Sequence, residues 1–207
     1  SFAALPANPA PPRPALPPPP AQPSRAEKRL PSKQTVLVRA WPGIAAGDPR
    51  EDALAVLMDA LSGLSSDLFI EVRDKRGLAY YVGATHFTGP VGGLFQIYAG
   101  TTAEGRAEVE TQIQAQVDRL RRDGLRSEEF SRAVEQLVAE QARLRQNNAA
   151  LAQQCALDEL LGLGYLHAFQ TAERLQGLAP EAVRAAAESI FAAPGDAVAV
   201  VAPDDSP

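Results

Sequence analysis

Few side chains in this 207-residue sequence are of a type that could act as a nucleophile, a general base or a metal ligand. The sequence contains two histidines, His86 and His167, and a single cysteine, Cys155. Neither histidine begins a zinc motif, and a single cysteine excludes both an internal disulfide and a thiolate zinc site. Glycine-rich nucleotide-binding motifs and the Gly-x-Ser-x-Gly turn of many hydrolases are absent. We therefore do not expect this chain to be a catalyst by itself.

These three residues also have ordinary structural interpretations. His86 lies near the end of a predicted strand, where we interpret it as a hairpin side chain, and His167 lies on a mixed helix. Cys155 is expected to be a small buried apolar residue on a helix. No metal or other cofactor is therefore expected to bind to this chain.

Composition excludes two classes of protein. The net charge is −5 and the basic residues are scattered, whereas a nucleic-acid surface needs a basic patch. A run of about eighteen apolar residues, which a membrane-spanning helix requires, does not occur. The compartment stays open between the cytoplasm and the periplasm of a bacterium. Because the first residue is Ser1 and not Met, we expect that a longer polypeptide was processed to give this sequence.

Proline marks the predicted domain boundary. Residues 1–31 contain eleven of the eighteen prolines, and proline fixes φ and removes a backbone donor. We interpret residues 1–31 as a semi-extended linker or tail. The alternative is a ligand for an aromatic-lined groove, because Arg13 lies among prolines in residues 11–14. Regular structure is expected to begin at Lys33, within one folded domain over residues 32–207.

The folded part begins with a strand and alternates between helices and strands. Apolar periodicity and turn residues predict a fold of the α+β class, with a mostly antiparallel sheet and helices packed on one face. A capping box is predicted at Thr101 and Glu104, and a left-handed helix stop at Gly77. The predicted strands cover residues 34–41, 78–87, 93–99 and 196–201, and the predicted helices begin near residues 49, 66, 101, 127, 148 and 180.

The most specific part of the sequence lies between residues 61 and 101. Residues 65–80 read SSDLFIEVRDKRGLAY, and residues 92–101 read GGLFQIYAGT. This pattern resembles the C-terminal half-domain of the pitrilysin/insulinase family of zinc metallopeptidases, which includes mitochondrial processing peptidase. The resemblance covers residues 33–202 and is strongest in the middle third. Asp67 departs from it, because many relatives carry Arg or Lys there.

The resemblance implies a division of labour between two homologous halves. One half carries an inverted His-x-x-Glu-His motif and the zinc, and it is fused to the other half or lies on a separate subunit. The other half, which this chain resembles, closes over the peptide substrate with an arginine and a tyrosine seven positions apart. Arg73 and Tyr80 fall on those two positions.

Elementary chemistry agrees with such a role. Arg73 is predicted at the end of a capped helix and Tyr80 at the start of the next strand, so one corner of the chain positions both. A peptide carbonyl or a developing oxyanion needs fixed donors of this kind. The alternative is that Arg73 only meets the helix dipole and Tyr80 only packs.

We thus interpret the chain as the substrate-binding, non-zinc half of a zinc metallopeptidase that hydrolyses peptide bonds. A catalytically inactive structural subunit of a larger assembly is the second interpretation, although such a subunit has no obvious need for Arg73 and Tyr80. The third is an adaptor that presents its proline-rich segment to a binding module.

Overall fold

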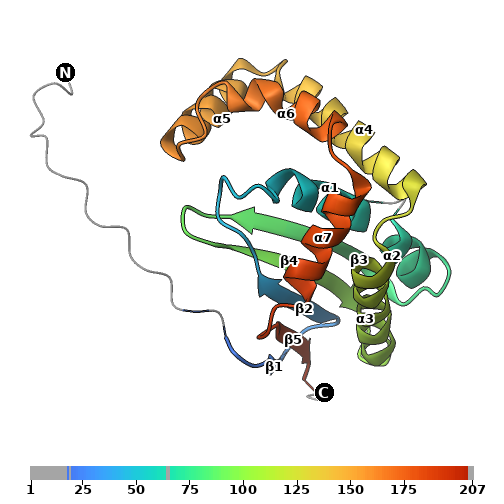
Figure 1. Cartoon of the computed structure of the whole chain (residues 1–207). Helices are drawn as coiled ribbons and strands as arrows, with labels where there is room; N and C mark the ends of the chain where they lie inside the picture. Colours follow the sequence, from blue (N-terminus) through green and yellow to red (C-terminus); the bar gives the residue numbers. More distant parts are fainter. Residues whose placement is uncertain (1–17, 19, 64–65, 205–207) are drawn as a thin grey trace, which may run out of the picture.

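The structure, a computed structural model, describes residue 18, residues 20–63 and residues 66–204 (Figure 1). A five-stranded sheet has the order β1-β5-β2-β4-β3. Strands β2, β4 and β3 are antiparallel neighbours, β5 is antiparallel to β2, and β1 is parallel to β5. The strands are β1 (Ser24–Leu30), β2 (Thr35–Pro42), β3 (Ala79–Thr88), β4 (Gly93–Thr101) and β5 (Ala197–Pro203).

Helices cover one face of this sheet in two layers. Helices α1, α3 and α7 contact the strands, α4 and α6 pack on α1, and α5 packs on α6 (Figure 1). The predicted α+β fold is therefore confirmed. The helices are α1 (Glu51–Leu61), α2 (Asp67–Phe69), the π-helical segment η2 (Ile70–Asp74), α3 (Arg106–Asp123), α4 (Ser127–Leu144), α5 (Asn148–Leu160), α6 (His167–Gln176) and α7 (Pro180–Phe191).

The core lies between the sheet and the inner helices. Alternate residues of β2 and β4 point to the helices, and Trp41 and Phe95 among them are fully enclosed. Phe191 of α7 meets both rings edge to face, with centroids 4.9 Å from Trp41 and 5.4 Å from Phe95. Helix α3 buries the four residues that its periodicity predicts, Val109, Ile113, Val117 and Leu120.

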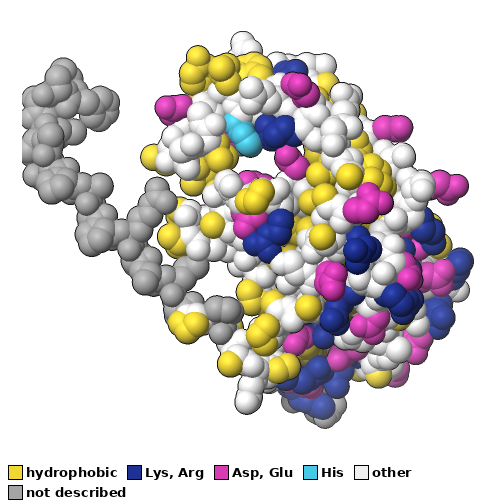
Figure 2. Space-filling view, viewed as in Figure 1, with side chains coloured by type: hydrophobic (Ala, Val, Ile, Leu, Met, Phe, Trp, Pro, Cys, Tyr) yellow, Lys and Arg dark blue, Asp and Glu magenta, His cyan; other side chains and the backbone are white. Residues whose placement is uncertain are grey.

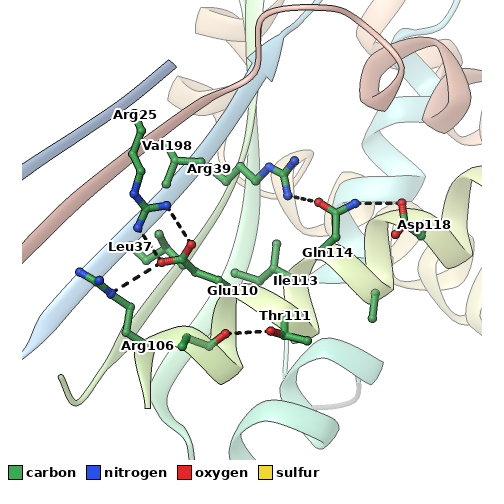
Figure 3. Close-up of a pocket in the computed structure, with 12 residues that line it drawn as sticks. Arg25, Leu37, Arg39, Arg106, Glu110, Thr111, Ile113, Gln114, Asp118 and Val198 are labelled. Carbon is green, nitrogen blue, oxygen red and sulfur yellow. Dashed lines mark hydrogen bonds and ion pairs between the residues drawn. The ribbon is translucent and has the colours of Figure 1, made fainter. Parts of the chain in front are cut away.

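The prediction that regular structure begins at Lys33 is wrong, because β1 pairs with β5 along the sheet edge. Residues 24–30 lie between Pro23 and Pro31 and contain no proline, so their amides are free to donate. Ion pairs fix β1 to α3, from Arg25 to Glu110 and from Arg106 to Glu27. Arg25, Arg106 and Glu110 line a groove of about 690 Å³ between α3 and the sheet (Figure 3). Residues 1–17, including the prolines of residues 11–14, lie outside the described residues.

The predicted capping box at Thr101 is also wrong. Thr101 is the last residue of β4, and its hydroxyl donates to the carbonyl oxygen of Leu78. Helix α3 begins at Arg106, and the Thr102 hydroxyl accepts from the amide of Gly105. The Thr101 side chain, which the sequence pattern assigned to the helix, thus bonds to the residue that precedes β3.

Replacing two phenylalanines of the β3–β4 hairpin by alanine should lower the free energy of unfolding by unequal amounts. Phe95 is 0% exposed and Phe87 is 68% exposed. We expect Phe95→Ala to lower the free energy of unfolding by about 3–5 kcal/mol, because it removes a buried ring and leaves a cavity. Phe87→Ala is the matched control and should change it by less than about 1 kcal/mol. Urea denaturation measures both, and equal costs would contradict the described core.

One carboxyl between α1 and α4 predicts a pH dependence. Burial and the nearby charge of Glu140 raise the pKa of Asp59 to about 6, and Arg132 partly opposes them. The unfolded chain releases this proton near pH 4, so stability should fall as the pH rises from about 4 to about 6. We expect Asp59→Asn to flatten this part of the profile in denaturation experiments. An unchanged slope would contradict the burial of this group.

Candidate functional site

The chain reverses direction at a short corner between η2 and β3. The Ser66 hydroxyl caps α2 by accepting from the Phe69 amide at 3.1 Å, and the π-helical segment follows at once. The amide of Leu78 then donates to the carbonyl oxygen of Val72 at 2.8 Å. Gly77 makes the reversal possible, with the predicted left-handed φ of +63°. Ser65, part of the predicted cap, lies outside the described residues.

Arg73 lies on this corner with its side chain exposed. Its guanidinium carbon lies 4.9 Å from the centroid of the Phe69 ring, a cation–π contact with a ring that is itself buried. Two neighbouring cations are neutralised, Lys75 by Glu71 at 2.6 Å and Arg76 by Glu108 at 2.7 Å. Arg73, in contrast, has no carboxylate partner in the part of the chain that the structure describes. Its guanidinium therefore contacts a buried ring and is not neutralised by a carboxylate among the described residues.

Tyr80 lies in a β-bulge at the start of β3. Ala79 pairs with Thr101 and Tyr81 pairs with Gly100, so Tyr80 has no residue opposite it on β4. A bulge redirects side chains relative to strict alternation. Tyr80 and Tyr81 are consequently both exposed, at 52% and 39%. The structure places Arg73 and Tyr80 at the same backbone corner, on opposite sides of the Gly77 turn.

The sheet face beside this corner carries aromatic residues that the sequence analysis did not single out. Gly83 and Gly100 leave room for rings, because a Cβ atom would lie 2.9 Å from the Tyr98 hydroxyl oxygen and 2.4 Å from the Tyr81 ring. The two tyrosine rings lie 6.2 Å apart on the face opposite the helices. In the two adjacent strands Tyr81 pairs with Gly100 and Gly83 pairs with Tyr98. This exchange of glycine and tyrosine was the signal in the sequence for the arrangement.

The histidines and the cysteine are not gathered at this corner. The ring centroids of His86 and Phe95 lie 6.0 Å apart. Burial lowers the pKa of His86, which favours the neutral imidazole near pH 7. His167 begins α6 and Cys155 lies partly exposed on α5. Within residues 20–63 and 66–204, His, Cys, Asp and Glu form no group of three that could hold a metal ion.

Charged side chains are most densely grouped at the lower right of the visible surface (Figure 2). Basic and acidic side chains are interspersed over α2 and α3, which differs from the single-sign surface that nucleic acid attracts. Hydrophobic side chains gather over α5 and α6, where Leu160 and Tyr165 are exposed. Among the described helices, none combines the length and the apolar character needed to cross a bilayer.

Comparisons with known proteins agree with each other. Residues 1–137 match the family described as the peptidase M16 inactive domain. The chain is 32% identical over 161 residues to an uncharacterized zinc protease of Streptomyces coelicolor, covering 77% of this chain and 35% of that protein. It is also 32% identical over 160 residues to an uncharacterized zinc protease of Bacillus subtilis, covering 72% of this chain and 38% of that protein.

A solved structure extends the likeness to almost the whole chain. The peptidase M16 inactive domain from Pseudomonas fluorescens superposes with a TM-score of 0.84 and 25% identity, covering 99% of this chain and 48% of that one. The chain thus spans less than half the length of each of these three proteins.

The backbone at Gly77 gives a direct prediction. A Cβ atom there would meet nothing within 4 Å, so only the positive φ opposes a side chain. We expect Gly77→Ala to lower the free energy of unfolding by about 1–2 kcal/mol. Gly177→Ala is the matched control, because Gly177 ends α6 with an ordinary φ of −84°. Equal effects of the two substitutions in thermal denaturation would contradict the described corner.

Proposed function

This chain belongs to the peptidase M16 family as an inactive domain, and we propose that it binds the peptide substrate for a separate half that holds the zinc. That half would be another domain of the same polypeptide or another subunit. The share of its relatives that the chain spans, between 35% and 48%, leaves room for such a half.

Zinc itself does not fit the residues of this chain. The sequence contains no His-x-x-Glu-His motif, and the described residues provide no cluster of three ligands. The chain's own contribution to peptide hydrolysis would therefore be to bind and orient the peptide.

The available charge of Arg73 is the observation that carries this proposal. A guanidinium donates through a planar fork, and a phenol donates one hydrogen bond, so Arg73 and Tyr80 can both serve peptide carbonyl oxygens. Donors positioned before the substrate arrives stabilise charge at a carbonyl most effectively, and the cation–π contact with Phe69 favours one position of the Arg73 guanidinium.

A peptidase assay of the assembled protein tests the proposal. We expect Arg73→Ala and Tyr80→Phe each to lower kcat/KM by about tenfold or more, because each removes a donor to the peptide. Lys75→Ala and Tyr81→Phe are matched controls from the same segment and should leave kcat/KM within about twofold.

Two results would overturn the proposal. If Arg73→Ala behaves like Lys75→Ala and Tyr80→Phe like Tyr81→Phe, neither residue binds substrate. If the assembly cleaves no peptide although its zinc-binding half is intact, the chain is a structural subunit.

A further inference from the structure

Four charged residues connect the corner that carries Arg73 to the turn between α3 and α4. We name them the anchor cluster: Asp67, Arg119, Arg126 and Glu129. They come from the start of α2, the end of α3 and the start of α4. None of the four is assigned a role in the proposed function.

Glu129 is the centre of the anchor cluster. It is only 2% exposed, and its carboxylate accepts from the Arg119 guanidinium at 3.0 and 3.1 Å and from the Arg126 amide at 2.7 Å. A buried carboxylate needs such partners, because its desolvation is otherwise uncompensated. Arg119 also donates to the carbonyl oxygen of Gly124 at 3.3 Å, which fixes the α3–α4 turn.

Asp67 joins this turn to the segment that carries Arg73. Its carboxylate pairs with Arg126 and lies 3.8 Å from Arg119. Asp67 is the first residue of α2, which continues without interruption into η2. Two residues after Asp67 comes Phe69, whose ring supports the Arg73 guanidinium. The two arginines and two carboxylates of the anchor cluster balance in charge, whereas Arg73 has no carboxylate partner among the described residues.

We propose that Asp67 is a positioning residue that acts through Arg73. By holding α2 against the α3–α4 turn, Asp67 sets where Phe69 lies and therefore where Arg73 presents its guanidinium. This inference rests on the proposed role of Arg73 in substrate binding. The Asp67–Arg126 pair is partly exposed, so its effect on global stability should be small compared with its effect on the geometry of the corner.

Hydrogen exchange tests the physical part without any substrate. The amides of Ile70, Lys75, Gly77 and Leu78 are hydrogen-bonded within the corner. In Asp67→Asn we expect them to exchange about tenfold faster, because local opening becomes easier, while the amides of β2 and β4 keep their rates. Asp67→Glu retains the carboxylate and should restore slow exchange. Asp52→Asn is the matched control, because Asp52 forms a similar 2.8 Å pair with Arg174 far from this corner.

Kinetics of the assembled peptidase test the link to Arg73. We expect Asp67→Asn to lower kcat/KM by about tenfold, because a misplaced donor no longer matches the peptide. In the Arg73→Ala background the same substitution should have little further effect, since both changes remove one interaction. Asp67→Glu should recover most of the activity, and Asp52→Asn should not reduce it.

The outcomes separate the two proposals. Unchanged exchange in Asp67→Asn overturns the positioning role whatever the activity. Fully additive effects of Asp67→Asn and Arg73→Ala overturn the action through Arg73, even if Arg73 binds substrate. If Arg73→Ala alone is silent, the proposed function fails and the kinetic part of this inference fails with it, whereas the exchange result still decides whether Asp67 holds the corner.

Discussion

The hydrogen bond from the Leu78 amide to the Val72 carbonyl joins the helical layer to the sheet at the point where the candidate site lies. This hydrogen bond completes a turn in which the chain reverses direction. The turn requires one residue with a left-handed backbone conformation, and Gly77 adopts it. On one side of the reversal the chain is fixed by the buried Val72 and Phe69, and on the other side by the pairing of β3 with β4. The positions of both Arg73 and Tyr80 depend on this reversal.

Covering the sheet on one face has a second consequence. The apolar side chains of β2 and β4 that point to the helices are enclosed, whereas Tyr81 and Tyr98 lie on the opposite face. The bulge at Tyr80 leaves a further phenol exposed. The molecule therefore has a sheet face that is covered by helices and an opposite face that carries Tyr81 and Tyr98.

Periodicity was sufficient to predict the larger elements. The four buried residues of α3 and the strands of the β3–β4 hairpin were predicted correctly, because apolar spacing reports burial directly. The family resemblance, carried by residues 65–80 and 92–101, is confirmed by the match to the peptidase M16 inactive domain.

Features that depend on contacts distant in sequence were not predicted. Strand β1 has no apolar alternation of its own and forms because β5 offers it a parallel edge. The bulge at Tyr80 depends on the register with β4, and the π-helical segment differs from an α-helix by one hydrogen-bond step. That Arg76 is paired while Arg73 is not was equally inaccessible from the sequence, because Glu108 reaches Arg76 from α3, 32 residues away.

Substrate binding by Arg73 and Tyr80 can be observed in a structure of the assembled protein with an uncleaved peptide bound. We predict that the Arg73 guanidinium and the Tyr80 hydroxyl each lie about 3 Å from a carbonyl oxygen of the peptide. A peptide bound beside the zinc with neither group within hydrogen-bonding reach would contradict it.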